Sequence, residues 1–349
     1  MKRRSMRIGL ALGAGGATGA SYLTGALEGV RRATGFSPAD ADVVLGTSAG
    51  AFIGSIAVLV PVPLVYAQSR GEHAEGFSSE MLDLAARMDA HNRGHFLHRF
   101  PPARRLPRPL FASPRAVLKG LLAPHRTTPE MVLTGLLGNG LLSTRSAGEV
   151  VRTALPRGWP SARLRIAALD LASGRRVVFG AEDAATVDLH TAVLASVSIP
   201  GLFAPVQIGG RSYIDAGSWS PSNLDALADS NLDFVLCINP LSGADAAPSS
   251  ASAFGRIGHF ARRRADRRLA IERRRLEERG CRVFVIHPTP VERALMVGGK
   301  FMGVESRADI VRAAADTVAS TLARPEFAEL RGALDTLKPT RRESSPRPL

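Results

Sequence analysis

The chain has 349 residues, 45% of them hydrophobic, which is enough apolar material to bury a core in one large domain or two. Its formal net charge of +14 comes mostly from arginine, and only two cysteines are present, so no disulfide framework is expected. The low cysteine content is compatible with a reducing compartment, so we expect a cytoplasmic protein. High positive charge permits nucleic-acid binding, but no known binding motif accompanies it, and no nucleic-acid partner is expected.

The first predicted strand covers residues 7–12 and leads into a glycine-rich turn at 13–19, which precedes a helix that runs to about residue 33. The basic start of the chain imitates a signal peptide, but the supposed apolar region contains the glycines, and we reject that interpretation. A nucleotide-binding G-x-G-x-x-G pattern fails because Thr18 occupies its sixth position, and no G-K-S/T follows. The unpaired amides of such a turn can instead hold an anion.

The pentapeptide G-T-S-A-G at residues 46–50 stands between an apolar run typical of a strand and an apolar stretch typical of a helix. This context indicates a nucleophile elbow, in which Ser48 sits on a sharp turn and Gly46 and Gly50 avoid collisions with the crossing chain. The helix that follows would direct its positive dipole end at the serine. The predicted oxyanion hole consists of amides from the preceding glycine turn, namely those of Gly15, Gly16 and Ala17.

Two segments, one that contains the elbow and one beyond it, have compositions that can indicate contact with a membrane. Residues 43–69 carry no charge, but they contain the elbow and two prolines, so we expect a core helix and an irregular segment rather than a membrane span. Residues 93–126 contain eight Lys or Arg and no acid, interleaved with prolines and apolar residues. This composition suits peripheral contact with an anionic membrane, which for a cytoplasmic protein is the inner face of the membrane. It fits a solvated insertion equally well. The segment could also form a lid over a pocket beside Ser48. The histidines in and near it lack acidic partners, so no metal site is predicted.

Alternating strands and helices predict an α/β protein with one three-layer domain around a mainly parallel central sheet. The predicted strands are residues 7–12, 43–46, 164–169, 175–179, 206–208, 212–214, 234–238 and 282–286. A Ser-Gly turn at 173–174 predicts one antiparallel hairpin. Cys237 and Cys281 lie in or beside strands, where they would pack as small hydrophobic residues. Residues 262–282 are typical of one long basic surface helix that ends at Gly280.

Asp215 follows an apolar strand and precedes a turn of small residues, which would present its carboxylate at a strand terminus. A glycine-rich loop, G-x-S-x-G around Ser48 and D-A-G at 215–217 occur in this order, and together they resemble the patatin-like phospholipase family. The family's pattern is a glycine-rich oxyanion loop, G-x-S-x-G and a distant D-G-G or D-G-A. Further similarity lies at residues 164–179 and in S-I-P-G-L-F at 198–203. The resemblance covers most of residues 6–320.

The resemblance implies a serine acyl hydrolase of the lipase or phospholipase A type that cleaves ester bonds of phospholipids or related lipids without a cofactor or metal. Ser48 and Asp215 would form a catalytic Ser/Asp dyad, and Gly217 would support the turn after the aspartate. The implied fold is a three-layer α/β/α patatin-like domain over residues 1–338, with a basic Pro/Arg-rich insertion at about 70–145. The polar tail at 339–349 is expected to be disordered.

Two positions depart from the family pattern and leave alternatives open. Thr18 stands where the family usually has Arg, and Ala216 stands where it usually has Gly; if residue 216 needed a positive φ, alanine would cost about 1 kcal/mol. A catalytically weak or inactive lipid-binding or regulatory relative is therefore an alternative, and so is an acyltransferase that uses the same acyl-enzyme. A Ser–Asp–His triad with His287 is a further alternative, although Ser48 comes too early in the chain for an ordinary α/β-hydrolase.

Overall fold

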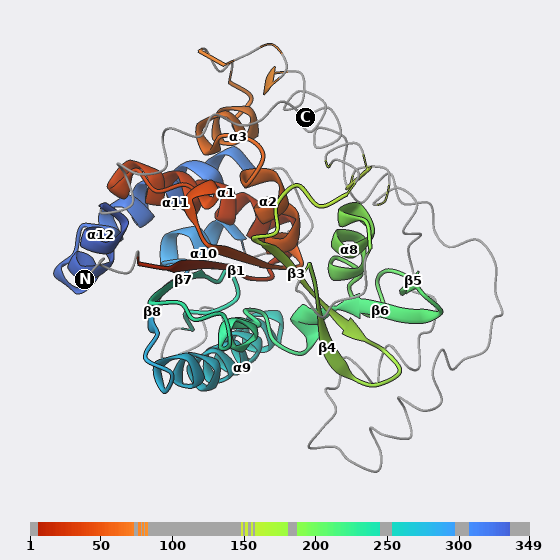
Figure 1. The fold of residues 1–349 in the computed structure, drawn as a ribbon. Helices are drawn as coiled ribbons and strands as arrows, with labels where there is room; N and C mark the ends of the chain where they lie inside the picture. Colours follow the sequence, from red (N-terminus) through yellow and green to blue (C-terminus); the bar gives the residue numbers. More distant parts are fainter. Residues whose placement is uncertain are drawn as a thin grey trace, which may run out of the picture.

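The computed structural model describes residues 6–72, 158–180, 187–244, 253–296 and 307–335, together with a few residues between 76 and 155 (Figure 1). The basic segment 93–126, most of the predicted insertion at 70–145 and the tail at 339–349 lie outside the described residues. The glycine turn, the elbow and Asp215 all lie within them, with the elements that position each.

The described residues form an eight-stranded mixed sheet. Its strands are β1 (Ile8–Leu12), β2 (Val43–Thr47), β3 (Leu164–Asp170), β4 (Arg175–Phe179), β5 (Val206–Ile208), β6 (Arg211–Asp215), β7 (Phe234–Ile238) and β8 (Arg282–Ile286). The strands in the order β3-β2-β1-β7-β8 are parallel, whereas β4, β5 and β6 pair antiparallel at the β3 end. Each strand lies within one residue of its predicted bounds, and the predicted β3–β4 hairpin is confirmed.

Strand β3 pairs with three neighbours, and the register shows that two of them share one edge. β2 pairs with β3 at residues 164–167, β6 pairs with it at 168–170, and β4 pairs with it at 166–170. Because a residue has one strand partner on each side, β4 takes one edge, and β2 and β6 meet end to end along the other. Thr47 pairs with Ala167 and Asp215 pairs with Ala168, so the carboxyl ends of β2 and β6 meet.

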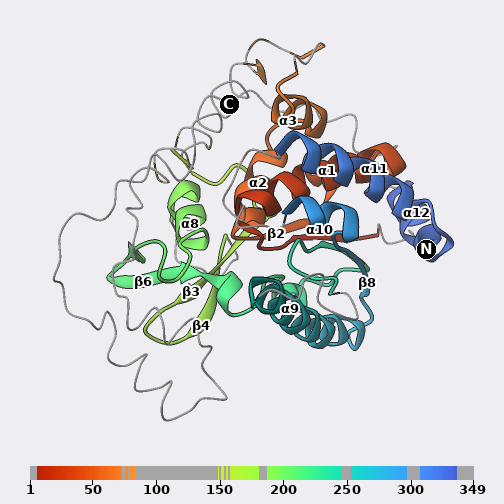
Figure 2. The same cartoon turned by 180° about the vertical axis from the view of Figure 1, so that it is seen from behind.

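Helices cover both faces of the sheet and confirm the predicted three-layer α/β/α architecture (Figures 1 and 2). One face carries α1 (Gly16–Thr34), α2 (Ala49–Ala57), α3 (Val62–Ser69), α8 (Leu189–Ser196), α10 (Pro290–Met296), α11 (Arg307–Leu322) and α12 (Ala328–Asp335). The other face carries the long helix α9 (Ala253–Glu277). Short 3₁₀ helices are η1 (Pro38–Asp40), η2 (Ala216–Ser218), η3 (Leu224–Leu227) and η4 (Pro325–Phe327).

The hydrophobic core lies on both faces of the parallel strands, because alternate side chains of each strand enter different layers. In β1, Leu10 and Leu12 pack into the cluster that includes α1 and α2, whereas Ala11 belongs to the cluster under α9 with Leu269 and Leu276. Burial on both faces explains why these strands are continuous apolar runs in the sequence. The carboxyl ends of β1 and β2 are thereby fixed between two packed layers.

Two helix predictions need correction. The uncharged segment 43–69 forms β2, α2 and a second helix, α3, where the sequence predicts an irregular segment. Pro61 and Pro63 stand at the N-terminus of α3, where a missing N–H removes no helical hydrogen bond. Helix α9 begins before the predicted start at residue 262, and Gly280 adopts a left-handed conformation (φ 81°) just after it ends. Within the described ranges, no helix is both long and apolar enough to cross a membrane.

Candidate active site

Ser48 occupies a sharp turn between β2 and α2. Its backbone has φ 54° and ψ −117°, a left-handed φ that is uncommon for a residue with a side chain and costs conformational energy. The chain crosses itself closely here, so a Cβ on Gly46 would lie 2.5 Å from the Ala51 Cα. A Cβ on Gly50 would lie 2.0 Å from the Leu12 carbonyl oxygen. Only glycine fits at either position.

A second serine holds this strained turn in place. The Ser48 N–H donates to Ser196 Oγ at 2.9 Å, and the Ser196 hydroxyl donates in turn to the Ala167 carbonyl at 2.7 Å. Ser196 is fully buried at the end of α8. Its hydroxyl therefore satisfies an amide that would otherwise be buried without an acceptor, and it links the elbow to β3.

Asp215 lies against Ser48 because β2 and β6 meet end to end along β3. It is 5% exposed, and it takes part in a side-chain hydrogen bond with Ser48. Its Oδ1 also accepts the Gly217 N–H at 2.7 Å, which closes a short turn. A Cβ on Gly217 would lie 2.9 Å from the same carboxylate oxygen. The structure thus brings together the serine and the acid that the sequence singles out.

The environment of Asp215 changes its basicity. Burial raises the pKa of Asp215 from its ordinary value of 3.8 to about 6, although the hydrogen bonds with Ser48 and the Gly217 N–H oppose this rise. A carboxylate with a pKa near 6 accepts a proton more readily than an exposed one and is still mostly ionised at neutral pH. Asp215 is therefore a candidate proton acceptor beside the Ser48 hydroxyl.

The glycine turn between β1 and α1 lies beside the elbow, since the Gly50 N–H donates to the Gly13 carbonyl at 3.1 Å. The amides of Gly13 and Ala14 are bonded to the carbonyls of Ile238 and Pro221. α1 has no side-chain cap and no acidic residue in its first turn, so nothing in that turn offsets its positive dipole end. The helix supplies no acceptor for the N-cap and first-turn amides, which are those of Gly15, Gly16 and Ala17.

The two departures from the family pattern have different structural consequences. Ala216 begins η2 without a positive φ, so the alanine carries no conformational penalty there. Thr18 is 1% exposed, and its hydroxyl has no hydrogen-bond partner among the described residues. Thr18 supplies no positive charge to the turn, so residue 18 cannot stabilise an anion there as the family's usual arginine would, whereas the amides at the start of α1 remain.

His287 follows β8, as the strand prediction implies, but it lies in a different group of side chains. A Cβ on Gly243 would come within 2.3 Å of its imidazole, and its charged neighbours include Asp266 and Arg293. The groups that act on the pKa of Asp215 are instead Ser48 and Gly217. For the part of the chain that is described, no three His, Cys, Asp or Glu side chains are grouped as metal ligands.

Three residues that support the site were not predicted from the sequence: Ser196, Asn223 and Glu272. Ser196 supports the Ser48 amide, and Asn223 and Glu272 belong to a buried polar cluster behind the site. A sequence signal for Glu272 exists, because residues 269, 272 and 276 share one stripe of α9 and the other two are buried leucines. Ser196 and Asn223 stand near the family motifs, but their partners are distant in the sequence.

Comparison with known proteins gives one family match. The family model described as Patatin-like phospholipase matches residues 10–228, which include the glycine turn, the elbow and Asp215. No curated protein matches the chain significantly. Among solved structures, the crystal structure of VipD from Legionella pneumophila is similar at 14% identity with a TM-score of 0.35, over 91% of this chain and 67% of that one.

Proposed function

Because the chain belongs to the patatin-like phospholipase family, we propose that it is a serine acyl hydrolase that cleaves ester bonds of phospholipids or related lipids. The observation that carries this proposal is the contact between Ser48, in a strained turn, and the buried Asp215 with its pKa near 6. A hydroxyl and a carboxylate in contact are the minimum set for direct nucleophilic attack on an ester.

In the proposed reaction, Ser48 Oγ attacks the ester carbonyl while its proton passes to the Asp215 carboxylate. The resulting oxyanion is held by the amides at the start of α1, and each such donor typically lowers the barrier by roughly 3 kcal/mol. Collapse of the intermediate expels the alcohol, which takes the proton from Asp215 and leaves an acyl-enzyme. Water then attacks the acyl group with Asp215 again as base, releasing the fatty acid and restoring Ser48.

Covalent labelling tests this proposal directly. A fluorophosphonate probe should modify the protein once, on Ser48, because the probe needs both an activated hydroxyl and an oxyanion hole. The variant Ser48→Ala should lose the label completely. Ser55→Ala is the matched control, since Ser55 is buried in α2, the helix that follows Ser48, and its hydroxyl donates to the Ala51 carbonyl. This variant should label like the wild type.

Hydrolysis should accompany labelling. Purified protein should release fatty acid from phospholipid vesicles, and added lysolipid should distinguish hydrolysis from acyl transfer by the products formed. Absence of both labelling and fatty-acid release in the folded wild type would reject the hydrolase and support the non-catalytic lipid-binding alternative.

A further inference from the structure

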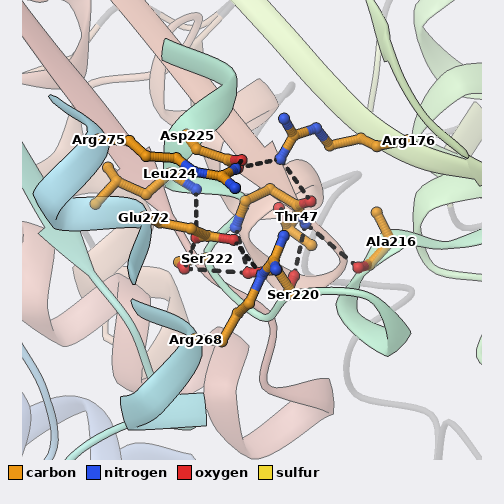
Figure 3. Close-up of polar contacts among 11 residues, drawn as sticks. Thr47, Arg176, Ala216, Ser220, Ser222, Leu224, Asp225, Arg268, Glu272 and Arg275 are labelled. Atoms are coloured by element: carbon orange, nitrogen blue, oxygen red, sulfur yellow. Dashed lines mark hydrogen bonds and ion pairs between the residues drawn. The ribbon is translucent and has the colours of Figure 1, made fainter. Parts of the chain in front are cut away.

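A buried polar cluster lies on the α9 side of the junction between β2 and β6 (Figure 3). Its central residue is Asn223, which is fully buried and has a left-handed backbone (φ 47°) just before η3. The Asn223 amide nitrogen lies 2.6 Å from the Ser220 carbonyl, 3.2 Å from Thr47 Oγ1 and 3.3 Å from the Ala216 carbonyl. Thr47 precedes Ser48, and Ala216 follows Asp215. One amide therefore connects the two backbone segments that carry the candidate dyad.

The other atoms of Asn223 are also held. Its backbone N–H donates to Ser220 Oγ at 3.0 Å, and Arg176 donates to its Oδ1 at 3.4 Å. Arg176 also pairs with Asp225, whose second oxygen accepts from Arg275 of α9 at 2.7 Å. The orientation of the amide is thus set from both ends.

Helix α9 clamps the segment that contains Asn223. Glu272 is fully buried, and its Oε2 accepts from Ser222 Oγ at 2.6 Å and from the Leu224 N–H at 2.9 Å, on either side of Asn223. Its Oε1 accepts from Arg268 Nε at 2.9 Å, and the Arg268 guanidinium stacks 4.7 Å from the centre of the Trp219 ring. A buried carboxylate is tolerated only when its hydrogen bonds are made, and here both oxygens are occupied.

We propose that Asn223 is a positioning residue for the Ser48–Asp215 pair, acting through Thr47 and Ala216, with Glu272 holding Asn223 in place. This inference rests on the proposed function. β2 and β6 share no ladder hydrogen bonds with each other where they meet end to end, and each is held there by its pairing with β3. The Asn223 amide adds a direct cross-link between the two segments, and because Asn223 is fully buried it would act without contacting substrate.

The test uses two variants that remove the cross-link from opposite ends. Asn223→Gly deletes the amide but tolerates the left-handed backbone, and Thr47→Val deletes the hydroxyl at nearly constant shape. Each should lower kcat per labelled active site by about 10- to 100-fold with KM little changed, because a displacement near 1 Å costs about that much. Thr47→Ser, which keeps the hydroxyl, should recover most of the loss.

Asn231→Gly is the matched control, because Asn231 is the other asparagine with a left-handed backbone among the described residues and lies exposed just before β7. It should leave kcat per active site unchanged. A purely structural role for Asn223 would reduce thermal stability and the fraction of labelled protein, while the labelled fraction kept its normal kcat. That pattern would overturn the proposal.

A second readout does not depend on activity. The difference in unfolding free energy between each protein and its Asp215→Asn partner, followed against pH, reports the pKa of Asp215 in the folded state. In Asn223→Gly and Thr47→Val the midpoint should fall from about 6 toward 3.8, because a loosened junction admits water to Asp215. An unchanged midpoint in both variants would refute positioning even if the protein had no hydrolase activity, whereas an inactive wild type would refute the proposed function alone.

The outer face of α9 carries an independent feature. Arg256, Phe260, Arg263, Arg267, Ile271 and Arg274 recur at helical spacing and are all exposed, on the side opposite the buried Leu269 and Leu276. Phe260 is 69% exposed and Ile271 is 51% exposed. Arginines on the flanks of α9 pair with acids, as Arg273 does with Glu277, whereas no described acid forms an ion pair with the four arginines of this outer stripe.

From this stripe we infer a docking surface for an anionic lipid bilayer. Apolar side chains between arginines suit the boundary of head groups and acyl chains, because the charges meet lipid phosphates while the apolar groups enter the interface. Each arginine near an anionic surface contributes about 1 kcal/mol, so four of them distinguish anionic from neutral lipid strongly. A nucleic acid would also attract the arginines, but it offers no apolar phase for Phe260 and Ile271.

Vesicle sedimentation with the full chain tests this surface. Binding to vesicles containing phosphatidylglycerol should exceed binding to pure phosphatidylcholine, and Phe260→Ser with Ile271→Ser should weaken it by at least 10-fold. Arg263→Gln with Arg267→Gln should weaken it similarly, whereas the control Arg273→Gln should have little effect. Equal binding by the wild type and both double variants would overturn the assignment, as would arginine-dependent binding to DNA that exceeds binding to vesicles.

Discussion

Replacing Asp215 by asparagine is expected to remove activity and, at neutral pH, to make the fold more stable. Asparagine cannot take the proton of Ser48, so kcat/KM should fall by about 10³- to 10⁴-fold. The stability gain follows from burial. A rise in the pKa of Asp215 from 3.8 to about 6 means that the free energy of unfolding is about 3 kcal/mol lower with this carboxyl charged than with it protonated.

The size of this stability difference depends on pH. Well below the ordinary pKa of 3.8 the carboxyl is protonated in both folded and unfolded chains, so wild type and Asp215→Asn should unfold at similar urea concentrations. Between pH 4 and pH 6 the wild type loses stability relative to the variant, because the unfolded chain releases a proton that the folded one retains. Above pH 6 the full difference of about 3 kcal/mol should persist.

Asp225→Asn is the matched control for the stability measurement. Burial alone would raise the pKa of Asp225. The hydrogen bond from Arg176 and the charges of Arg268 and Arg275 outweigh burial and hold this pKa below its ordinary value. Asp225→Asn should therefore destabilise the protein at neutral pH, whereas Asp215→Asn should stabilise it. If the wild type is as stable as Asp215→Asn at pH 7.5, or more stable, the Asp215 carboxylate is not buried and poorly solvated. The proposed chemistry depends on that environment.

The same group should shape the pH dependence of turnover. Only the carboxylate form of Asp215 can accept the Ser48 proton, so kcat/KM should rise with pH through a midpoint near 6. Activity that remained constant down to pH 5 would assign the base to another group. Turnover should thus be lowest in the acidic range where the destabilising contribution of Asp215 disappears, as measured by initial rates and by urea unfolding of wild type and Asp215→Asn in the same buffers.

Gly50→Ala is expected to be the most destabilising single-methyl change in the described core. The added Cβ would lie 2.0 Å from the Leu12 carbonyl oxygen and 2.4 Å from the Leu12 carbonyl carbon, which are backbone atoms of the central strand β1. Relief would require β1 and α2 to separate, and this would break the Gly50–Gly13 hydrogen bond. We expect a loss of about 4 kcal/mol or more in unfolding free energy, or no folded protein.

Gly332→Ala provides the control for this change. Gly332 lies inside α12, and a Cβ there would meet nothing within 4 Å. The same methyl group should stabilise the protein by about 0.5–1 kcal/mol through helix propensity. Thermal and urea unfolding of both variants measures the contrast. A folded Gly50→Ala protein with a loss under 1 kcal/mol would show that the strand and helix do not cross as closely as described.

Much of the fold could be predicted because its signals are local. The buried strands are uninterrupted apolar runs. The elbow and the glycine turn are recognisable by their glycines, which are needed where two chain segments cross closely or where the first amides of a helix stay open. The prediction for 61–69 was wrong because prolines at a helix start and prolines in a loop look alike in sequence. The early start of α9 has no clear local signal.

The supporting part of the site could not be predicted, because it depends on which strands become neighbours. Nothing near Thr47 indicates that its hydroxyl would contact Asn223, and nothing near Ser48 indicates that Ser196 would accept its amide. Glu272 looks like one more surface acid in a basic helix until its stripe is compared with Leu269 and Leu276. These contacts join segments far apart in the chain, and they follow from the register of β2 and β6 on β3.

The meeting of β2 and β6 at one edge of β3 also bears on how the protein is made. Ser48 leaves the ribosome roughly 170 residues ahead of Asp215, which at about 5–20 residues per second is a delay on the order of ten seconds or more. During that interval the hydroxyl has no base beside it, and the α9 clamp has yet to be translated. A nascent chain therefore lacks the assembled Ser48–Asp215 pair, and the proposed hydrolytic activity would arise only after β6 and α9 have been synthesised and have packed on the sheet.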